Sequence, residues 1–443
     1  MRSIKRLTVT HVQATIICAK ISNLQVRIRS GGHDYEGMSY VSNVLFVIVD
    51  MINLRSIDID FDETNGINLG NQTGWVQAGA TLGELYYKIG KTSNTLAFPA
   101  GVCLTLGAGG HFSGGGYGPM LRHFGMTIDN IIEAIVVDAN GTLLDRGSMG
   151  GNLFLGCQWG RGPSFCVIIA WKIKLVRVPD TITVFNVPRS LEQGATDIVL
   201  QWLEIATKID RKLFIRVQPQ VQFIGGGSKT VQVSFIGMYL GRATSVISLI
   251  ESNFPRLGLQ PSDCNEMPWV KTHLFWNNLS QTSPIEVLSD YVKDPIPRSG
   301  LETIWNNMIE VENVFVQWNP YGGKMSEISE NSTRFPHRKG ILFMMQYIII
   351  WHDDTDQALI TNIKATRDLH VTFTPFVTNN PRKAFFNYRD IDIGTNVEGN
   401  LSFAIDFFKD NVNRLLQVKA KVDPNNLFRY EQSIPLESAI QVI

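Results

Sequence analysis

The sequence predicts an α+β protein with more than one domain, and three observations support this. Up to residue 178, segments with helical spacing alternate with short segments in which every second residue is apolar. Beyond residue 178, the chain contains longer strand-like segments that are separated by helices. At about 100–200 residues per domain, the 443 residues suffice for two or three domains.

The first expected elements are a helix and a strand. The helix follows Thr10, its predicted N-cap, and has one apolar face, formed by Val12, Ile16 and Ala19. At 24–28, apolar residues alternate with Gln25 and Arg27, and this alternation predicts a strand. This strand leads into Gly31 and Gly32, so we expect His33 on a tight loop.

The next expected elements are strands at 44–50 and 75–78 and a helix from Thr81 with one apolar face, formed by Leu82, Leu85, Tyr86 and Ile89. Strands 131–137 and 142–144 flank Asn140-Gly141, a pair that favours a type I′ hairpin turn. Longer strands are expected at 212–223, 229–239 and 341–351, with helices near 194–208 and 244–253.

Composition limits the classes of function. Lys plus Arg equals Asp plus Glu at 40 each, so there is no overall field that would recruit nucleic acid. No apolar run approaches the ~18 residues of a transmembrane span. The five cysteines are scattered and odd in number, unlike a disulfide framework or a CxxC metal site, so we expect no metal. Small molecules are therefore the expected partners.

The segment 101–118 is unusually rich in glycine. Eight of its eighteen residues are glycine, against a background of about 7%. Successive backbone amides in such a segment can cradle an anion. The segment lacks the ending of a P-loop, the third glycine of a dinucleotide fingerprint, where Phe112 stands, and the first glycine of a nucleophile elbow around Ser113. A structural turn explains the glycines as well as a cofactor site does, and a lone His33 or Cys103 more often has a structural role.

Two long motifs resemble the flavin-linking motifs of the plant berberine bridge enzyme-like family. They are 29–37, which contains His33, and 98–118, which contains Cys103. The resemblance continues at 129–131, 144–146, 319–323, 335–338, 387–390 and 423–434. It implies a PCMH-type (vanillyl-alcohol oxidase-like) FAD-binding fold, with an FAD-binding domain of residues 1–178 plus 390–443. The substrate-binding domain would be 179–389 and would contain a central antiparallel sheet.

The resemblance also implies how FAD is held. His33 would bond the flavin methyl carbon and Cys103 the neighbouring ring carbon, so that FAD is attached covalently at two positions. The residues expected around the cofactor are Arg29, Ser30, Gly31, Gly32, His33, Cys103, Gly107, Gly109, Gly110, His111, Ser113, Gly114, Gly116, Gly118, Asn387 and Tyr388.

The reaction implied by the resemblance is the oxidation of an alcohol, with hydride transfer to the flavin while a base accepts the hydroxyl proton. Tyr35, Tyr117 and Gln346 are the expected polar wall around the substrate. That substrate would be a phenolic allylic alcohol or a carbohydrate hydroxyl. Leu106 is expected to act as an oxygen gate, and a bulky leucine there favours a dehydrogenase with another electron acceptor over an oxidase.

Departures from the family pattern keep a second interpretation open. Phe385 occupies the position at which relatives commonly carry a tyrosine base, and phenylalanine cannot accept a proton. Met344 stands where relatives often carry a lysine. The segment 159–166 carries Arg161, Pro163 and Cys166 in place of glycines or small residues. The alternative is therefore an impaired flavin-fold protein that binds a carbohydrate or phenolic ligand without turnover.

The indications about location disagree. The chain opens without the pattern of a secretory signal. The resemblance, however, implies an extracellular or cell-wall setting, and five glycosylation sequons agree with that setting, at Asn71, Asn140, Asn278, Asn331 and Asn400. We further expect a monomer.

Overall fold

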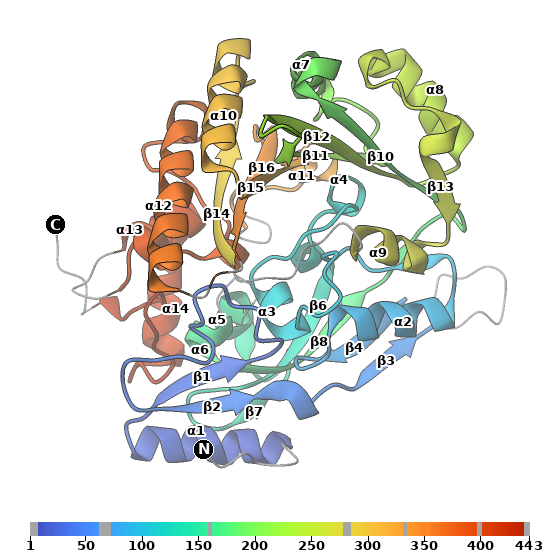
Figure 1. Ribbon diagram of the computed structural model, residues 1–443. Coiled ribbons are helices and arrows are strands. Elements are labelled where there is room, and N and C mark those ends of the chain that lie inside the picture. Colours follow the sequence, from blue (N-terminus) through green and yellow to red (C-terminus); the bar gives the residue numbers. More distant parts are fainter. Residues whose placement is uncertain are drawn as a thin grey trace.

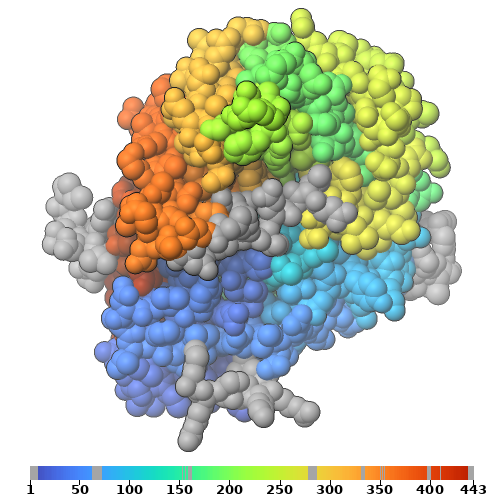
Figure 2. All heavy atoms as spheres, viewed as in Figure 1, coloured from blue at the N-terminus to red at the C-terminus, as the bar shows by residue number. Residues whose placement is uncertain are grey.

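Two antiparallel sheets contain most of the strands of the computed structural model. The structure describes residues 8–437 apart from 62–71, 158–161, 278–284, 331–334, 352, 354 and 397–400. Figure 2 shows the N-terminal third of the chain, in blue and cyan, at one end of the molecule and the middle of the chain, in green to orange, at the other. Among the described helices, none is both long enough and apolar enough to cross a bilayer.

A helix and two parallel strands begin the described chain. Helix α1 (Val9–Ile21) packs on β1 (Gln25–Arg29) and β2 (Phe46–Asp50) (Figure 1). The predicted helix is confirmed, but its N-cap is Thr8 and not Thr10. The predicted strand is confirmed as β1. Arg27 on this strand is buried, and its guanidinium donates hydrogen bonds of 2.7 and 2.9 Å to Glu431, 404 residues away, which compensate its charge inside the protein.

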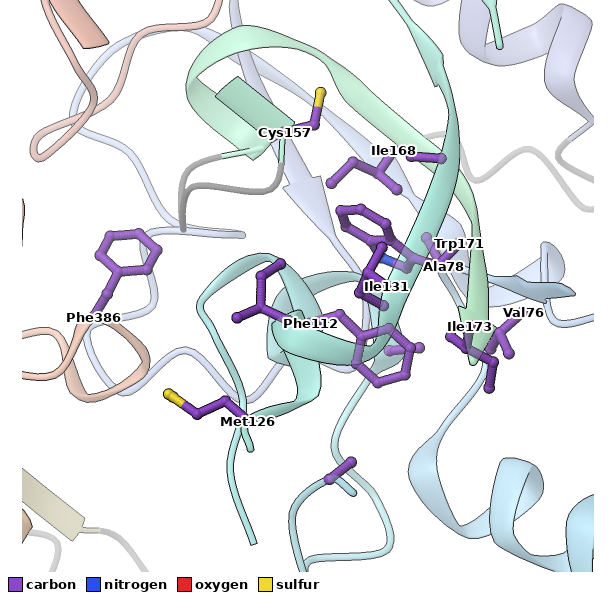
Figure 3. Close-up of a cluster of buried hydrophobic side chains, with 14 of the residues drawn as sticks. Val76, Ala78, Phe112, Met126, Ile131, Cys157, Ile168, Trp171, Ile173 and Phe386 are labelled. Carbon is purple, nitrogen blue, oxygen red and sulfur yellow. The ribbon is translucent and has the colours of Figure 1, made fainter. Parts of the chain in front are cut away.

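A five-stranded sheet follows, in the order β3-β4-β8-β6-β7. Its strands are β3 (Ile57–Asp60), β4 (Thr73–Gln77), β6 (Ile131–Val137), β7 (Leu143–Leu144) and β8 (Val167–Lys174). Helix α3 (Ala108–Ser113) lies against this sheet, with the ring centroids of Phe112 and Trp171 6.5 Å apart (Figure 3). The glycine-rich segment is therefore fixed to a buried core on one side.

Helix α2 (Leu82–Thr92) confirms the helix predicted from Thr81 and its apolar face, and Thr81 is its N-cap. The hairpin between β6 and β7 is also confirmed. The prediction of a type I′ turn is wrong. Such a turn needs a positive φ at both central residues, and here only Gly141 has one, of 77°. The Asp138 carboxylate accepts hydrogen bonds of 2.8 Å from the amides of Asn140 and Thr142, which closes the loop in a different geometry.

A seven-stranded sheet forms the other end of the molecule, in the order β13-β10-β12-β11-β15-β16-β14. Its strands are β10 (Ile182–Ser190), β11 (Leu213–Phe223), β12 (Lys229–Tyr239), β13 (Cys264–Met267), β14 (Ile285–Val292), β15 (Val314–Pro320) and β16 (Phe343–Ile350). The helices α7 (Ala195–Ile205), α8 (Ala243–Asn253), α10 (Arg298–Val311) and α12 (Asp356–Phe373) share its apolar core (Figure 1). The long strands predicted beyond residue 178 are confirmed.

The two faces of this sheet differ in character. Val217, Trp318 and Tyr347 belong to the core beneath the helices. Because side chains alternate along a strand, the neighbouring positions 216, 317 and 346 point to the opposite face. That face is directed toward the glycine-rich segment.

The C-terminal segment returns to the N-terminal end of the molecule. Its helices are α13 (Ser402–Phe408) and α14 (Val412–Val422), and α14 packs against α5 (Gly150–Gly156). The buried ammonium of Lys419 on α14 donates hydrogen bonds of 2.7 and 2.8 Å to the carbonyls of Ser164 and Phe428. Besides short 3-10 helices, the remaining described elements are β5 (Leu96–Ala97), α4 (Leu121–Phe124), α6 (Gly162–Phe165), β9 (Val176–Arg177), α9 (Trp269–Asn277) and α11 (Lys324–Glu327).

Candidate active site

A cavity of about 500 Å³ lies between the glycine-rich loops and the polar face of the seven-stranded sheet. Its lining includes most of the residues predicted for the site, namely Ser30, Gly31, Gly32, His33, Tyr35, Cys103, Leu106, Gly107, Gly109, Gly110, His111, Ser113, Tyr117, Gly118, Gln346, Phe385, Asn387 and Tyr388. Residues more than 350 positions apart in the sequence thus share one cavity.

The loops that carry His33 and Cys103 are in direct contact. Gly31 and Gly107 approach so closely that a β-carbon on either residue would collide with the backbone of the other. Thr105 interacts with both predicted attachment residues, since its backbone hydrogen-bonds the His33 ring and its hydroxyl lies 3.4 Å from Cys103 Sγ. Partial burial lowers the pKa of His33, and the Thr105 hydrogen bond opposes that shift. A neutral imidazole therefore faces the cavity near neutral pH.

The loop after β1 offers successive unpaired amides. Within the described chain, the N–H groups of Gly31, Gly32 and His33 donate no hydrogen bond to protein. Gly32 has a positive φ of 73°, which turns its amide relative to those of its neighbours. Consecutive N–H groups of this kind bind anions such as a diphosphate. The diphosphate group of FAD fits this loop.

Three predicted cofactor residues lie outside the cavity lining. The Arg29 guanidinium pairs with the Asp50 carboxylate at 3.0 Å. Gly114 and Gly116 lie beneath Asn387, where the Gly116 amide donates to Asn387 Oδ1 at 3.3 Å and a β-carbon on Gly114 would lie 2.3 Å from the Asn387 side chain. These two glycines therefore position Asn387.

His111 also has a structural partner. Its Nε2 accepts a hydrogen bond of 3.0 Å from the Gly101 amide, and burial lowers the pKa of His111 to about 4. The ring is therefore neutral at physiological pH and fixes the start of the glycine-rich segment.

Hydrogen-bonded hydroxyl groups form one wall of the cavity. The hydroxyls of Tyr117 and Tyr388 lie 2.5 Å apart, and Asn319 Nδ2 donates to Tyr117 at 3.2 Å. Asn319 in turn accepts a bond of 2.8 Å from Arg216 Nε. Burial raises the pKa of Tyr117, although the Arg216 charge and the Tyr388 hydrogen bond act in the opposite direction. This wall can orient a substrate hydroxyl.

Tyr35 lies beside Gln346, and its ring centroid is 6.1 Å from that of Tyr388. Its hydroxyl hydrogen-bonds the Gln346 side chain. Although Tyr35 as a whole is 36% exposed, desolvation is the main cause that raises the pKa of its hydroxyl. The two residues come from the His33 loop and from β16, so the substrate wall expected from the sequence combines both ends of the molecule.

Phe385 is packed among aromatic rings. It is 1% exposed, and its ring centroid lies 5.5 Å from that of Tyr117 and 5.1 Å from that of Tyr388. Met344 is fully buried and does not line the cavity. Neither side chain can exchange a proton.

The segment 159–166, in which larger residues replace glycines or small residues of the family pattern, lies partly outside the residues that the structure describes. Residues 159–161 lie outside the described chain, whereas Pro163 and Cys166 both line the cavity. Of the five sequons, Asn71, Asn278, Asn331 and Asn400 also lie outside it. Asn140 is exposed, and its side chain accepts a hydrogen bond of 2.8 Å from Lys20.

Sequence reasoning missed the contribution of the middle strands to the cavity. The lining includes Arg216 on β11 and Phe315 and Gln317 on β15. Asn319, also on β15, donates a hydrogen bond to the Tyr117 hydroxyl. A charged residue between Ile215 and Val217, both buried, was the available signal. The strand pattern alone could not show that the sheet face carrying Arg216 lies against a cavity.

Comparisons with known proteins match both ends of the chain to family models. Residues 7–147 match a family model described as an FAD binding domain, and residues 384–435 match one described as berberine and berberine like. Berberine bridge enzyme-like 3 from Arabidopsis thaliana is 49% identical over 450 residues, which cover 96% of this chain and 82% of that protein.

Two solved structures are similar over nearly the whole chain. The BBE-like #28 protein from Arabidopsis thaliana superposes with a TM-score of 0.90 at 40% identity, covering 97% of this chain and 90% of that one. Wild-type Phl p 4.0202, a glucose dehydrogenase, superposes with a TM-score of 0.89 at 38% identity, covering 98% and 90%.

Proposed function

Because this chain belongs to the berberine bridge enzyme-like family of FAD-binding oxidoreductases, we propose that it oxidises an alcohol with FAD bonded to both His33 and Cys103. The observation that carries this proposal is the convergence of the two predicted attachment loops and the tyrosine wall on one cavity. The contact of Gly31 with Gly107 supports attachment at both residues, because it brings the two loops together.

The residues around the cavity would have three roles: binding the cofactor, orienting the substrate and accepting its proton. The amides of Gly31, Gly32 and His33 would hold the diphosphate of FAD. FAD, when bound, supplies a hydride acceptor. Tyr35, Gln346 and Tyr117 would orient the substrate hydroxyl, since their polar groups line the same cavity. In place of Phe385, we assign acceptance of the hydroxyl proton to the Tyr117–Tyr388 pair. One member of the pair must be ionised to phenolate, which becomes a neutral phenol when it takes the proton, and the short hydrogen bond between the two oxygens would stabilise that phenolate.

The substrate is a carbohydrate hydroxyl or the allylic alcohol of a phenolic compound. The similarity to a glucose dehydrogenase supports the first class. The aromatic side chains of Tyr35, Phe315 and Tyr388 in the lining support stacking against either a sugar or a phenolic ring.

The attachment is tested by denaturing the purified protein in acid. Yellow flavin should stay with the precipitated wild-type chain and with the single variants His33→Ala and Cys103→Ala, since each keeps one bond. It should be released only from the double variant. Flavin in the wild-type supernatant would remove the covalent part of the proposal.

Phe385 favours a second candidate, a flavin protein that binds an alcohol without oxidising it, because the residue at the base position is buried and apolar. Anaerobic mixing with alcohols of both substrate classes separates the two. Bleaching of the flavin absorbance by any alcohol excludes the silent protein. Unchanged absorbance together with measurable binding favours it.

A further inference from the structure

Arg216 is a buried cation that lacks an anionic partner in the described chain. It is 6% exposed, and Nε donates to Asn319 Oδ1 at 2.8 Å. Its two terminal amino groups donate no hydrogen bond to any described residue, and none of the described carboxylates pairs with it. Since Arg216 lines the cavity, these groups are available to a ligand.

Other buried arginines of the described chain are compensated. Arg27 pairs with Glu431 at 2.7 Å, and Arg338 pairs with Asp129 at 2.6 Å. Arg122 donates to the backbone carbonyls of Tyr321, Asp210, Leu213 and Ile209. Burying an unpaired charge is costly, so such a charge is usually balanced by an ion or a ligand. Among the described residues, no carboxylate pairs with Arg216 and no backbone carbonyl accepts from it. Its guanidinium carbon lies 5.3 Å from the centroid of the Trp276 ring, and the residue lines the cavity where a substrate would bind.

We propose that the substrate carries a carboxylate and that Arg216 binds it through its two terminal amino groups. This inference rests on the proposed function and narrows its substrate to hydroxyl-bearing organic acids, such as a sugar acid or a phenolic acid. The planar guanidinium presents paired donors that match the two oxygens of a carboxylate. The bond to Asn319 fixes the guanidinium in advance, which lowers the entropy cost of binding.

The surroundings favour a carboxylate over a phosphate. Gln317 and Gln346 are partners in register on β15 and β16, and both line the cavity as neutral amides. One arginine balances the single charge of a carboxylate. A phosphate dianion would leave one charge uncompensated in a cavity whose other walls include Phe315 and Ile348.

The test is calorimetric titration of the purified protein with matched pairs of probes, D-glucuronate against D-glucose and vanillylmandelate against vanillyl alcohol, in which each acid keeps an oxidisable hydroxyl. At least one acid should bind more tightly than its neutral partner. In Arg216→Gln that acid should bind about 10- to 100-fold more weakly, because charge-assisted hydrogen bonds are lost, while the neutral partner should change little. Arg216→Lys keeps the positive charge but lacks the paired donors of the planar guanidinium, so its affinity for the acid should lie between those of the wild type and Arg216→Gln.

The matched control is Arg256→Gln, which removes an exposed arginine outside the cavity and should leave both affinities unchanged. Thermal unfolding and flavin content check that each variant is folded. The inference is overturned if neither acid binds more tightly than its partner, or if Arg216→Gln and Arg216→Lys weaken acid and neutral probe equally. The latter result would assign Arg216 to Tyr117 or to the cofactor. The calorimetric test measures binding and not oxidation, so it can be interpreted even if no probe reduces the flavin.

Discussion

Gly31 and Gly107 pack backbone against backbone. A β-carbon on Gly31 would lie 2.4 Å from the Gly107 nitrogen, and one on Gly107 would lie 2.2 Å from the Gly31 nitrogen. Real β-carbons do not approach other atoms so closely. The two predicted attachment residues are therefore brought to one cavity by a contact that only glycine allows.

Gly107→Ala should separate the two loops. We expect a loss of about 1–3 kcal/mol in the free energy of unfolding, as for other overpacked sites, and a smaller fraction of chains with flavin bonded at both positions. Denaturant titration and flavin content by absorbance measure the two effects. Gly151→Ala is the control, because a β-carbon there meets nothing within 4 Å. Equal stability and flavin content in both variants would contradict the role of this contact.

Phe385→Tyr should raise the rate of flavin reduction. The new hydroxyl would enter the ring cluster beside Tyr117 and Tyr388 and could act as a general base, an effect typically of 10²–10⁴-fold. Anaerobic stopped-flow mixing with an alcohol substrate measures the rate. Phe223→Tyr, on the exposed end of β11, is the control. If the rate in Phe385→Tyr equals that of the wild type, position 385 is not the base position.

The rate of flavin reduction in the wild type should rise with pH. A phenol accepts a proton only as phenolate, and burial raises the pKa of Tyr117, so the reactive form is a small fraction at neutral pH. Below that pKa the phenolate fraction grows about tenfold per pH unit, so no plateau should appear below about pH 10, the ordinary phenol value. Tyr117→Phe should abolish the slope. A rate that is level between pH 6 and 9 would exclude this tyrosine pair as proton acceptor.

Leu106→Val should increase the reactivity of the reduced protein with oxygen. Leu106 lines the cavity, and the smaller side chain would open space beside the flavin ring. Reoxidation of photoreduced protein by dissolved oxygen measures the effect. Leu104→Val provides the matched control, since Leu104 does not line the cavity. Unchanged reoxidation in Leu106→Val would mean that another residue limits oxygen access.

Local signals were sufficient to predict the elements that local interactions stabilise. Thr81 and Glu84 form a capping box, and the apolar face of α2 follows directly from residue spacing. The turn at Asn140-Gly141 was mispredicted because the Asp138 side chain overrides the preference of the pair. The burial of Arg27 depends on Glu431, and no local pattern reveals a partner 404 residues away.

The same distinction holds for the candidate site. His33 and Cys103 could be predicted because each lies within a long motif that resembles a known one. Arg216 and Asn319 could not, because their importance depends on which face of the seven-stranded sheet meets the glycine-rich loops. Tertiary packing decides that orientation, and the strand pattern does not.

Peptide mapping of the native holoprotein by mass spectrometry tests whether FAD is bonded to both His33 and Cys103. After proteolysis, the peptide with His33 and the peptide with Cys103 should appear as one species, joined through a single flavin. This species should absorb near the flavin maximum and should be missing from His33→Ala and Cys103→Ala, in which one peptide alone carries the flavin. Wild-type peptides that both appear at their unmodified masses would exclude covalent attachment at either residue.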